Sequence, residues 1–265
     1  MPAGVFDALL GKIEDFAGDA VIGISLWGEP SLHPEGKELI ERVLARPALS
    51  LVVETSGVGW KEDELKALAA AASRAAPRKN YMAPLSWIVS LDAHESERYR
   101  ELRGPGFSEA RSTAKTLLSL FPRDAYVQAV RVKDFEDDIE RFYRSWKEEP
   151  EVLASGRRDG GHIIIQKYDD FAGALPKMQA SDLSPVKRRP CWHIQRDMNI
   201  LLDGRALCCR EDLDSLKGNG EAWGNVFTED LAVVWERGAA LYLEHCKNEY
   251  RGICGHCDEY YTYNF

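Results

Sequence analysis

Short apolar, β-branched runs alternate with amphipathic stretches along the first two thirds of the chain. The apolar runs cover residues 20–26, 49–54, 86–91, 126–132 and 162–166. The helical patterns cover residues 5–17, 35–45, 61–75, 108–121 and 135–146. This alternation predicts an α/β fold, in which parallel strands are joined by helical crossovers. Because the runs are almost continuously apolar, we expect both faces of the sheet to be covered.

About five such strands fit either a partial (β/α) barrel or a doubly wound sheet. In both architectures a binding site forms at the carboxyl ends of the strands. The segments that follow the first three apolar runs are Trp27-Gly28-Glu29-Pro30, Thr55-Ser56-Gly57 and Ser90-Leu91-Asp92. A glycine and a proline after a strand usually shape a turn, so the first segment taken alone indicates little. The three segments together indicate a site at this edge of the sheet.

All six cysteines lie in the last 75 residues, and Cys254 and Cys257 form a Cys-x-x-Cys pair. Thiolates in such numbers favour zinc or an iron–sulfur cluster. Disulfides are disfavoured, because the chain is acidic, with a net charge of −9, shows no signal-peptide pattern and is large enough to bury a core. A zinc ribbon uses two close cysteine pairs. The spacing here therefore leaves structural zinc open and favours a four-cysteine iron–sulfur cluster.

A β-hairpin is predicted between the cysteines, because Asp203-Gly204 suits a two-residue type I′ turn. With that turn, Cys208 lies opposite Asn199, and Cys209 lies opposite Met198. Neighbouring residues of a strand point to opposite faces. Only one of Cys208 and Cys209 is therefore expected to face the metal site.

The cysteine-rich tail resembles the SPASM/twitch domains that follow the catalytic domain of many radical S-adenosylmethionine (SAM) enzymes and hold auxiliary 4Fe–4S clusters. The resemblance covers residues 191–265 and is carried by Pro190-Cys191-Trp192, Asp203-Gly204, Cys208-Cys209-Arg210, Gly224-Asn225-Val226 and Cys254-Gly255-His256-Cys257. The family's opening Cys-to-Gly-to-Cys spacing is met if the second ligand is Cys209. The resemblance implies a one-cluster form whose ligands are Cys191, Cys209, Cys254 and Cys257. Cys208 and Cys246 are then expected to be small buried side chains.

The strand-end segments, taken in order, resemble the core of radical SAM domains. In that family the first segment lies along the methionine amino group of SAM, and the third lies near its carboxylate and ribose. The resemblance implies that Gly28, Glu29 and Pro30 form the amino side of a SAM site. Ser90 and Arg103 are the corresponding candidates for the carboxylate side.

Radical SAM domains open with a Cys-x3-Cys-x2-Cys loop that holds the SAM-binding 4Fe–4S cluster, and this sequence lacks that motif. We expect it to be the carboxyl-terminal part of a longer protein; a degenerate homologue that lost its chemistry is the alternative. Residues 1–175 would then form a partial barrel, residues 176–190 a linker and residues 191–265 the SPASM/twitch domain. The chain alone is not expected to cleave SAM.

The resemblance implies an enzyme that modifies a peptide, protein or small molecule through radical chemistry started by SAM cleavage, with the auxiliary cluster transferring electrons. An electron donor such as flavodoxin or ferredoxin would serve it. More narrowly, the chain resembles SPASM proteins of spirochaetes. The alternative is a non-catalytic binding module with structural zinc or an iron–sulfur site. Negative net charge argues against a nucleic-acid partner, and because the sequence lacks an apolar run of about 20 residues, a cytoplasmic, membrane-free protein is expected.

Overall fold

The computed structural model describes residues 1–25, 27–133, 135–156, 161–178, 190–218 and 222–257. It divides into two compact units, a larger one over residues 2–167 and a smaller one over residues 168–265, with which Met1 is grouped. Most of the expected linker over residues 176–190 lies outside the described residues, as does the closing segment over 260–265.

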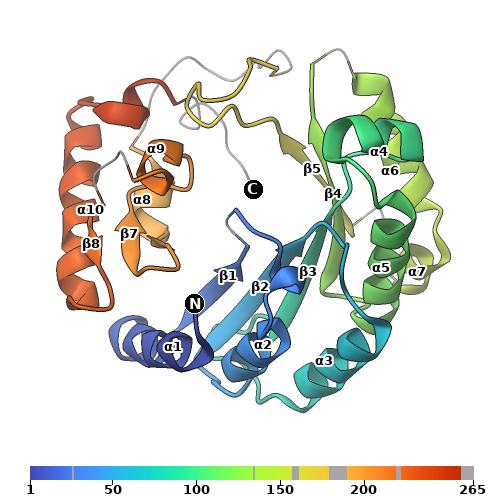
Figure 1. Cartoon of the computed structure of the whole chain (residues 1–265), viewed down its shortest axis with the longest axis horizontal. Helices are drawn as coiled ribbons and strands as arrows, with labels where there is room; N and C mark the ends of the chain where they lie inside the picture. The colour runs from blue at the N-terminus through green and yellow to red at the C-terminus, as the bar shows by residue number, and fades with distance from the viewer. Residues whose placement is uncertain (26, 134, 157–160, 179–189, 219–221, 258–265) are drawn as a thin grey trace. The chain divides into compact units, whose positions relative to one another are not determined.

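The larger unit is built on a five-stranded parallel sheet (Figure 1). Its strands are β1 (Ala20–Ile24), β2 (Leu49–Thr55), β3 (Leu85–Ser90), β4 (Ala125–Arg131) and β5 (Ile163–Lys167). Each strand pairs in parallel with the one before it, in the order β1-β2-β3-β4-β5. A doubly wound sheet would reverse its order at a switch point. The predicted parallel sheet is therefore confirmed, and its sequential order is that of an open, barrel-type sheet.

Helices connect the strands, and α1, α2, α3 and α5 lie along one face of the sheet (Figure 1). The helical elements are α1 (Ala3–Ala17), η1 (Pro30–Leu32), α2 (Gly36–Leu44), α3 (Glu62–Arg74), α4 (Ser96–Arg103), α5 (Phe107–Leu120), α6 (Glu136–Lys147) and α7 (Pro150–Ala154). The five long helices were predicted. The sequence pattern did not predict α4, because Tyr99 is its single buried residue and most of the others are charged. In the described part of the chain, every helix is too short or too polar to cross a membrane.

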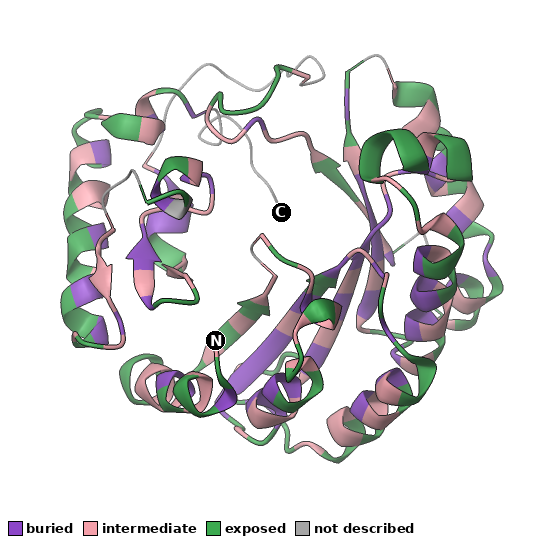
Figure 2. Cartoon of the chain, in the orientation of Figure 1, coloured by how far each residue is buried: buried purple, intermediate pink, exposed green. Residues whose placement is uncertain are grey.

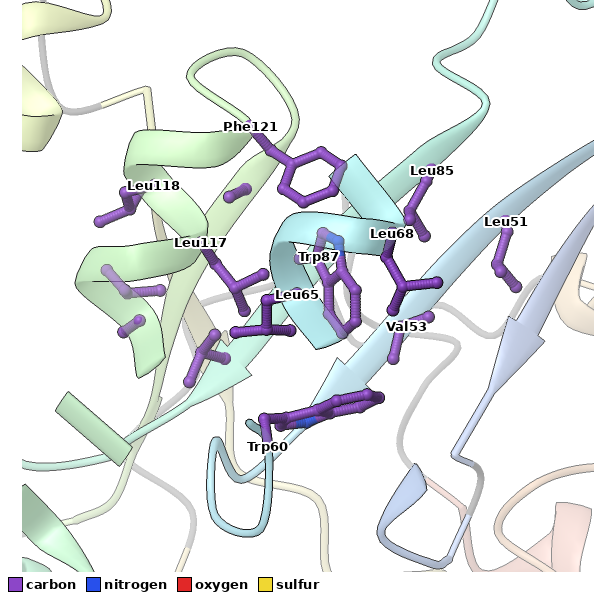
Figure 3. Packing of buried hydrophobic residues seen from close by; sticks show 14 of the residues in the cluster. Leu51, Val53, Trp60, Leu65, Leu68, Leu85, Trp87, Leu117, Leu118 and Phe121 are labelled. Carbon is purple, nitrogen blue, oxygen red and sulfur yellow. The ribbon is translucent and has the colours of Figure 1, made fainter. Parts of the chain in front are cut away.

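The main core lies between the sheet and these helices (Figure 3). Trp87 of β3 is fully buried there, and Leu65 and Leu68 of α3 belong to the same cluster. The Trp87 ring meets the Trp60 ring edge to face, with 5.1 Å between the ring centroids. The Trp60 indole N–H donates to Thr55 Oγ1 at 2.9 Å, so a buried polar atom is satisfied at the end of β2.

The opposite face of the sheet differs from the prediction that both faces are covered. Val21 of edge strand β1 points to this face and is 45% exposed. Ile165 of edge strand β5 is 39% exposed even though it shares the helix-covered face with its core partner Ala129. Buried residues concentrate in the central strands (Figure 2). Apolar β-branched residues suit the pleated backbone of an edge strand as well as that of a central strand. An apolar run therefore did not reveal whether a second layer lies over it.

Glu149 fastens α7 to α5 through two ion pairs. Glu149 is 8% exposed, and its carboxylate lies 2.5 Å from Arg111 Nη2 and 2.6 Å from Lys115 Nζ. Burial acts to raise the pKa of Glu149, but the hydrogen bonds and charges of Lys115 and Arg111 outweigh it and lower the pKa. Glu149→Gln should therefore reduce the free energy of unfolding by roughly 1–3 kcal/mol near pH 7.

The direction of the Glu149 pKa shift determines how the stability lost in Glu149→Gln depends on pH. A lowered folded-state pKa stabilises the fold above the unfolded pKa, about 4.3 for glutamate, and the stabilisation disappears as the pH falls through the folded-state pKa. Urea denaturation at pH 7 and at pH 3 should show the wild-type and Glu149→Gln proteins converging at the lower pH. Glu148→Gln, at an exposed neighbouring position, is the matched control. If the difference in unfolding free energy between the two proteins were the same at pH 7 and pH 3, the ionised Glu149 would not be the source of the stabilisation.

The smaller unit combines one 16-residue helix, several short helices and a three-stranded antiparallel sheet in the order β6-β7-β8. Its elements are α8 (Trp192–Arg196), β6 (Asn199–Ile200), β7 (Arg205–Leu207), α9 (Leu213–Leu216), β8 (Gly224–Asn225), α10 (Leu231–Cys246) and η2 (Gly252–Gly255). Helix α10 begins at a capping residue, since the Asp230 side chain accepts a hydrogen bond from the Ala232 backbone.

The hairpin is present between β6 and β7, but its predicted turn is wrong by one residue. Asn199 pairs with Leu207, where Cys208 was expected. The loop has three residues, 202–204, and the Leu201 N–H donates to the Arg205 carbonyl across it at 2.9 Å. Gly204 takes a φ of +85°, the left-handed residue that a three-residue loop requires. Because β7 ends at Leu207, strand alternation does not apply to the two cysteines that follow it.

Candidate functional site

A cavity of about 350 Å³, here called the strand-end pocket, lies in the larger unit where β1, β2 and β3 end. It is lined by Ser25, Trp27, Gly28, Glu29, Glu54, Thr55, Ser56, Ser90 and Arg103. Its volume is within the range of small-molecule sites. Four of the five residues proposed from the sequence for one site line this pocket together. The fifth, Pro30, is buried at the first position of η1 and does not line it.

The Glu29 carboxylate fastens the loop after β1 to the end of β2. Oε1 accepts hydrogen bonds from Thr55 Oγ1 at 2.5 Å and from the Ser31 N–H at 3.3 Å. Oε2 accepts from the Ser56 N–H at 2.7 Å and from Ser56 Oγ at 2.6 Å. Both oxygens are therefore already engaged within the protein. The Glu29 side chain therefore holds the loop that forms one wall of the pocket, and Gly28 of this loop lines the pocket.

Arg103, the last residue of α4, is held against the end of β3. Its Nε donates to Asp92 Oδ2 at 2.6 Å. The other carboxylate oxygen of Asp92 accepts the Val130 N–H at 2.8 Å, and Asp92 itself has a φ of +62°. Strained backbone of this kind clusters at functional sites. Asp92 thus fixes a guanidinium at the rim of the pocket.

Glu54 and Gln128 are site residues that the sequence reasoning missed. Glu54 Oε1 accepts from Ser90 Oγ and from Gln128 Nε2, each at 2.9 Å, and Gln128 Nε2 lies 3.2 Å from Ser90 Oγ. The three side chains come from β2, β3 and β4. A polar residue inside an otherwise apolar strand was the signal that could have identified both Glu54 and Gln128.

The smaller unit contains a second cavity, here called the thiol pocket. It is lined by Cys191, His193, Ile194, Cys208, Cys209, Glu211, Ile253, Cys254 and Cys257. The four cysteines proposed as ligands therefore lie around one space, although they are up to 66 positions apart in the sequence (191 to 257). Cys208 lines it as well, so the expectation that only one of Cys208 and Cys209 faces it is wrong. Cys246 is exposed at the end of α10, where a buried residue was expected.

Local structure explains how the cysteines are brought to this pocket. Cys191 precedes α8, and its backbone N–H donates to His245 Nδ1 of α10 at 3.3 Å. Cys254 lies in η2, and the Cys257 N–H donates back to the Ile253 carbonyl at 3.0 Å. The chain thus turns between the paired cysteines, and both side chains line the same wall.

Cys208 and Cys209 have different partners. Burial raises the pKa of both thiols. The Cys208 thiol donates to Asp212 Oδ2 at 3.8 Å, an arrangement that keeps the proton on sulfur. A backbone hydrogen bond acts to lower the pKa of both thiols, from Glu211 to Cys209 and from the backbone of residue 208 to Cys208, so the bond to Asp212 is what distinguishes them. A hydrogen bond from the backbone suits a thiolate ligand, and a carboxylate acceptor suits a neutral thiol.

The donor set fits an iron–sulfur cluster. Ionised thiolates are costly to bury unless a metal compensates their charge. Among the described residues, no three His, Cys, Asp or Glu side chains are arranged to hold a single metal ion. A four-cysteine cluster does not need such convergence, because each thiolate ligates a different iron.

Comparison with known proteins gives one relative in sequence and several in structure. No protein-family model matches the chain. A protein of Treponema pallidum described as uncharacterized is 39% identical over 272 residues, which cover all of this chain and 71% of that protein. Treponema pallidum is a spirochaete, which agrees with the narrower resemblance seen in the sequence.

Three solved structures of radical SAM enzymes show the same fold, each with a TM-score of 0.58. BtrN in complex with AdoMet and 2-DOIA is 12% identical, with 97% of this chain and 80% of that chain covered. Streptococcus suis SuiB bound to the precursor peptide SuiA is 15% identical, with 89% and 58% covered. The enzyme anSMEcpe with bound AdoMet is 13% identical, with 95% and 76% covered.

Proposed function

Because the chain belongs to the family of the Treponema pallidum protein and has a radical SAM/SPASM-like fold, we propose that it is part of a radical SAM enzyme. In this proposal SAM binds in the strand-end pocket, and an auxiliary 4Fe–4S cluster binds in the thiol pocket. One observation carries it: Gly28, Glu29, Ser90 and Arg103, chosen from the order of motifs along the chain, line a single cavity.

The residues of the strand-end pocket would bind and orient SAM. The Arg103 guanidinium, positioned by Asp92, supplies the positive charge that a carboxylate requires. The loop at Gly28, fastened by Glu29, offers backbone groups on the opposite side. The Trp27 indole N–H is buried, and among the described residues it has no hydrogen-bond partner, so it is a donor that a ligand could use after a small shift. In radical SAM chemistry the cofactor supplies a carbon radical that abstracts hydrogen, while the protein supplies binding and orientation.

Cys191, Cys209, Cys254 and Cys257 would hold the auxiliary cluster, whose chemistry when bound is electron transfer. One feature supports Cys209 as the second ligand: the Cys208 thiol is already engaged by the Asp212 carboxylate. The apolar walls formed by Ile194 and Ile253 would exclude water. An electron donor such as flavodoxin or ferredoxin, and a peptide, protein or small molecule to be modified, complete the proposed reaction. SAM cleavage is assigned only to a protein that also has the Cys-x3-Cys-x2-Cys motif.

SAM binding tests the proposal directly. The chain is purified anaerobically and reconstituted with iron and sulfide, and SAM affinity is measured by isothermal titration calorimetry. Arg103→Met should weaken SAM binding by about tenfold, because it removes a charge-assisted hydrogen bond. Arg100→Met, an exposed position on the same helix, should leave the affinity unchanged. The SAM assignment fails if the wild-type chain does not bind SAM, or if Arg103→Met binds it as tightly as the wild type.

A further inference from the structure

Glu54 is the centre of a hydrogen-bonded triad that spans three adjacent strands. It lies one residue before the end of β2, and Ser90 and Gln128 are paired with each other across β3 and β4. Both partners donate to the same atom, Glu54 Oε1, at 2.9 Å. The Glu54 backbone N–H also donates to Ser25 Oγ at 3.1 Å. The position of the carboxylate is thus fixed from several sides.

The partners of Glu54 are buried, whereas Glu54 reaches the surface of the pocket. Ser90 is 3% exposed and Gln128 is 2% exposed, while Glu54 is exposed and lines the strand-end pocket. In the described part of the chain, Gln128 Oε1 is buried with no hydrogen-bond partner. Leaving one end of a buried amide unpaired is costly in a folded protein. The unpaired oxygen belongs to the same Gln128 amide whose nitrogen donates to Glu54 and holds its carboxylate in place.

Glu54 is the carboxylate on the wall of this pocket that has an oxygen left open to a ligand. The Glu29 carboxylate is saturated by Ser31, Thr55 and Ser56, and Asp92 is paired with Arg103. No salt bridge to Glu54, and no hydrogen bond to its Oε2, occurs among the described residues. A carboxylate with one oxygen engaged and the other open is an acceptor for a cationic group. The carboxyl ends of parallel strands are where α/β proteins bind ligands.

We propose that Glu54, positioned by Ser90 and Gln128, binds an organic cation, either an alkylammonium or a sulfonium group. Two molecules of the proposed reaction could supply it. SAM carries an ammonium and a sulfonium, and the molecule to be modified could carry an amine. The cation site stands on the geometry of the triad, whereas the choice between its two sources rests on the proposed function.

The experiment compares wild-type chain with Glu54→Gln, which keeps the shape of the side chain and removes its charge. Glu54→Asp keeps the charge, and Glu97→Gln changes an exposed carboxylate of α4 as the matched control. The probes are n-butylammonium and its neutral counterpart n-butanol, measured by ligand-observed NMR, and SAM and S-adenosylhomocysteine, measured by calorimetry. Circular dichroism melting confirms that each variant is folded.

Wild-type chain should bind n-butylammonium about fivefold more tightly than n-butanol, near the upper limit for an ion pair at an exposed carboxylate. Glu54→Gln should lose this preference, Glu54→Asp should keep part of it and Glu97→Gln all of it. An unchanged SAM affinity in Glu54→Gln would assign the site to the modified molecule. An equal loss for SAM and S-adenosylhomocysteine would assign it to the ammonium of SAM, and a loss for SAM alone to the sulfonium.

The proposal is overturned if wild-type chain shows no preference for n-butylammonium and Glu54→Gln binds SAM normally. The n-butylammonium measurement does not depend on SAM. If SAM fails to bind wild-type chain while the preference for the cation is present, the proposed function is wrong and the cation site remains. The two failures can therefore be told apart.

Discussion

Replacing Cys254 and Cys257 together by alanine should abolish iron binding by the smaller unit. Both thiols line the thiol pocket from one turn of the chain, and two ligands remain too few to hold a four-cysteine cluster. The apolar core around them is small, since the buried members of its cluster are three cysteines and Ile194. Metal binding in such a domain contributes folding free energy. The double variant should therefore also lose cooperative unfolding of residues 168–265.

Iron and sulfide analysis, visible absorption and hydrogen exchange of the anaerobic protein measure these losses. Wild-type protein should contain about four irons and four sulfides per chain. Cys246→Ala, at an exposed position, should keep them all. Cys208→Ala should keep them if Cys209 is the ligand. One zinc per chain without visible absorption, or full iron content in the double variant, would contradict the proposed cluster.

Glu29→Ala should destabilise the larger unit more than any other single change at the strand-end pocket. It leaves four donors from Ser31, Thr55 and Ser56 without their acceptor. Hydrogen bonds to a charged group contribute roughly 1.5–3 kcal/mol each, but these four share one carboxylate and are partly replaced by water. We expect the free energy of unfolding to fall by about 3 kcal/mol and SAM binding to be lost, because the loop at Gly28 is released.

Urea denaturation followed by the fluorescence of the buried tryptophans measures the stability, and calorimetry measures SAM binding. Glu97→Ala, an exposed glutamate on α4, should change neither. Glu29→Gln should fall between the wild type and alanine, since it still accepts at one oxygen. If Glu29→Ala unfolded at the same urea concentration as the wild type, the hydrogen bonds between Glu29 and the end of β2 would not stabilise the larger unit.

Secondary structure of the larger unit was predictable because its strands are strongly apolar and its long helices amphipathic. Part of the lining of the strand-end pocket was predictable: Gly28 from the segment that follows β1, and Arg103 from the family resemblance. Glu54 and Gln128 escaped prediction, because they lie inside strands and their meeting depends on the pairing of β2, β3 and β4. The sequence does not reveal the register of neighbouring strands, and the register decides which polar residues lie side by side on one face of the sheet.

The hairpin shows why the rest could not be predicted locally. An Asp-Gly pair suits both a two-residue and a three-residue loop. Contacts from β8 and the residues after it accompany the longer loop: Asn225 Nδ2 donates to the Asp203 carbonyl at 2.9 Å, and the Val226 N–H donates to the Gly204 carbonyl at 2.8 Å. A Cβ at position 204 would lie 2.5 Å from the ring of Phe227. These partners lie more than 20 positions further along the chain, beyond any local pattern.

All residues of the strand-end pocket come from residues 2–167, and all residues of the thiol pocket come from residues 168–265. Each pocket is therefore complete within one unit. Oxygen should attack the thiol pocket first, because all six cysteines of the chain lie after residue 190 and the strand-end pocket contains no thiol. If the proposed cluster is bleached by oxygen, the protein should consequently keep its proposed affinity for SAM. Visible absorbance would then report on the thiol pocket, and SAM binding would report on the strand-end pocket.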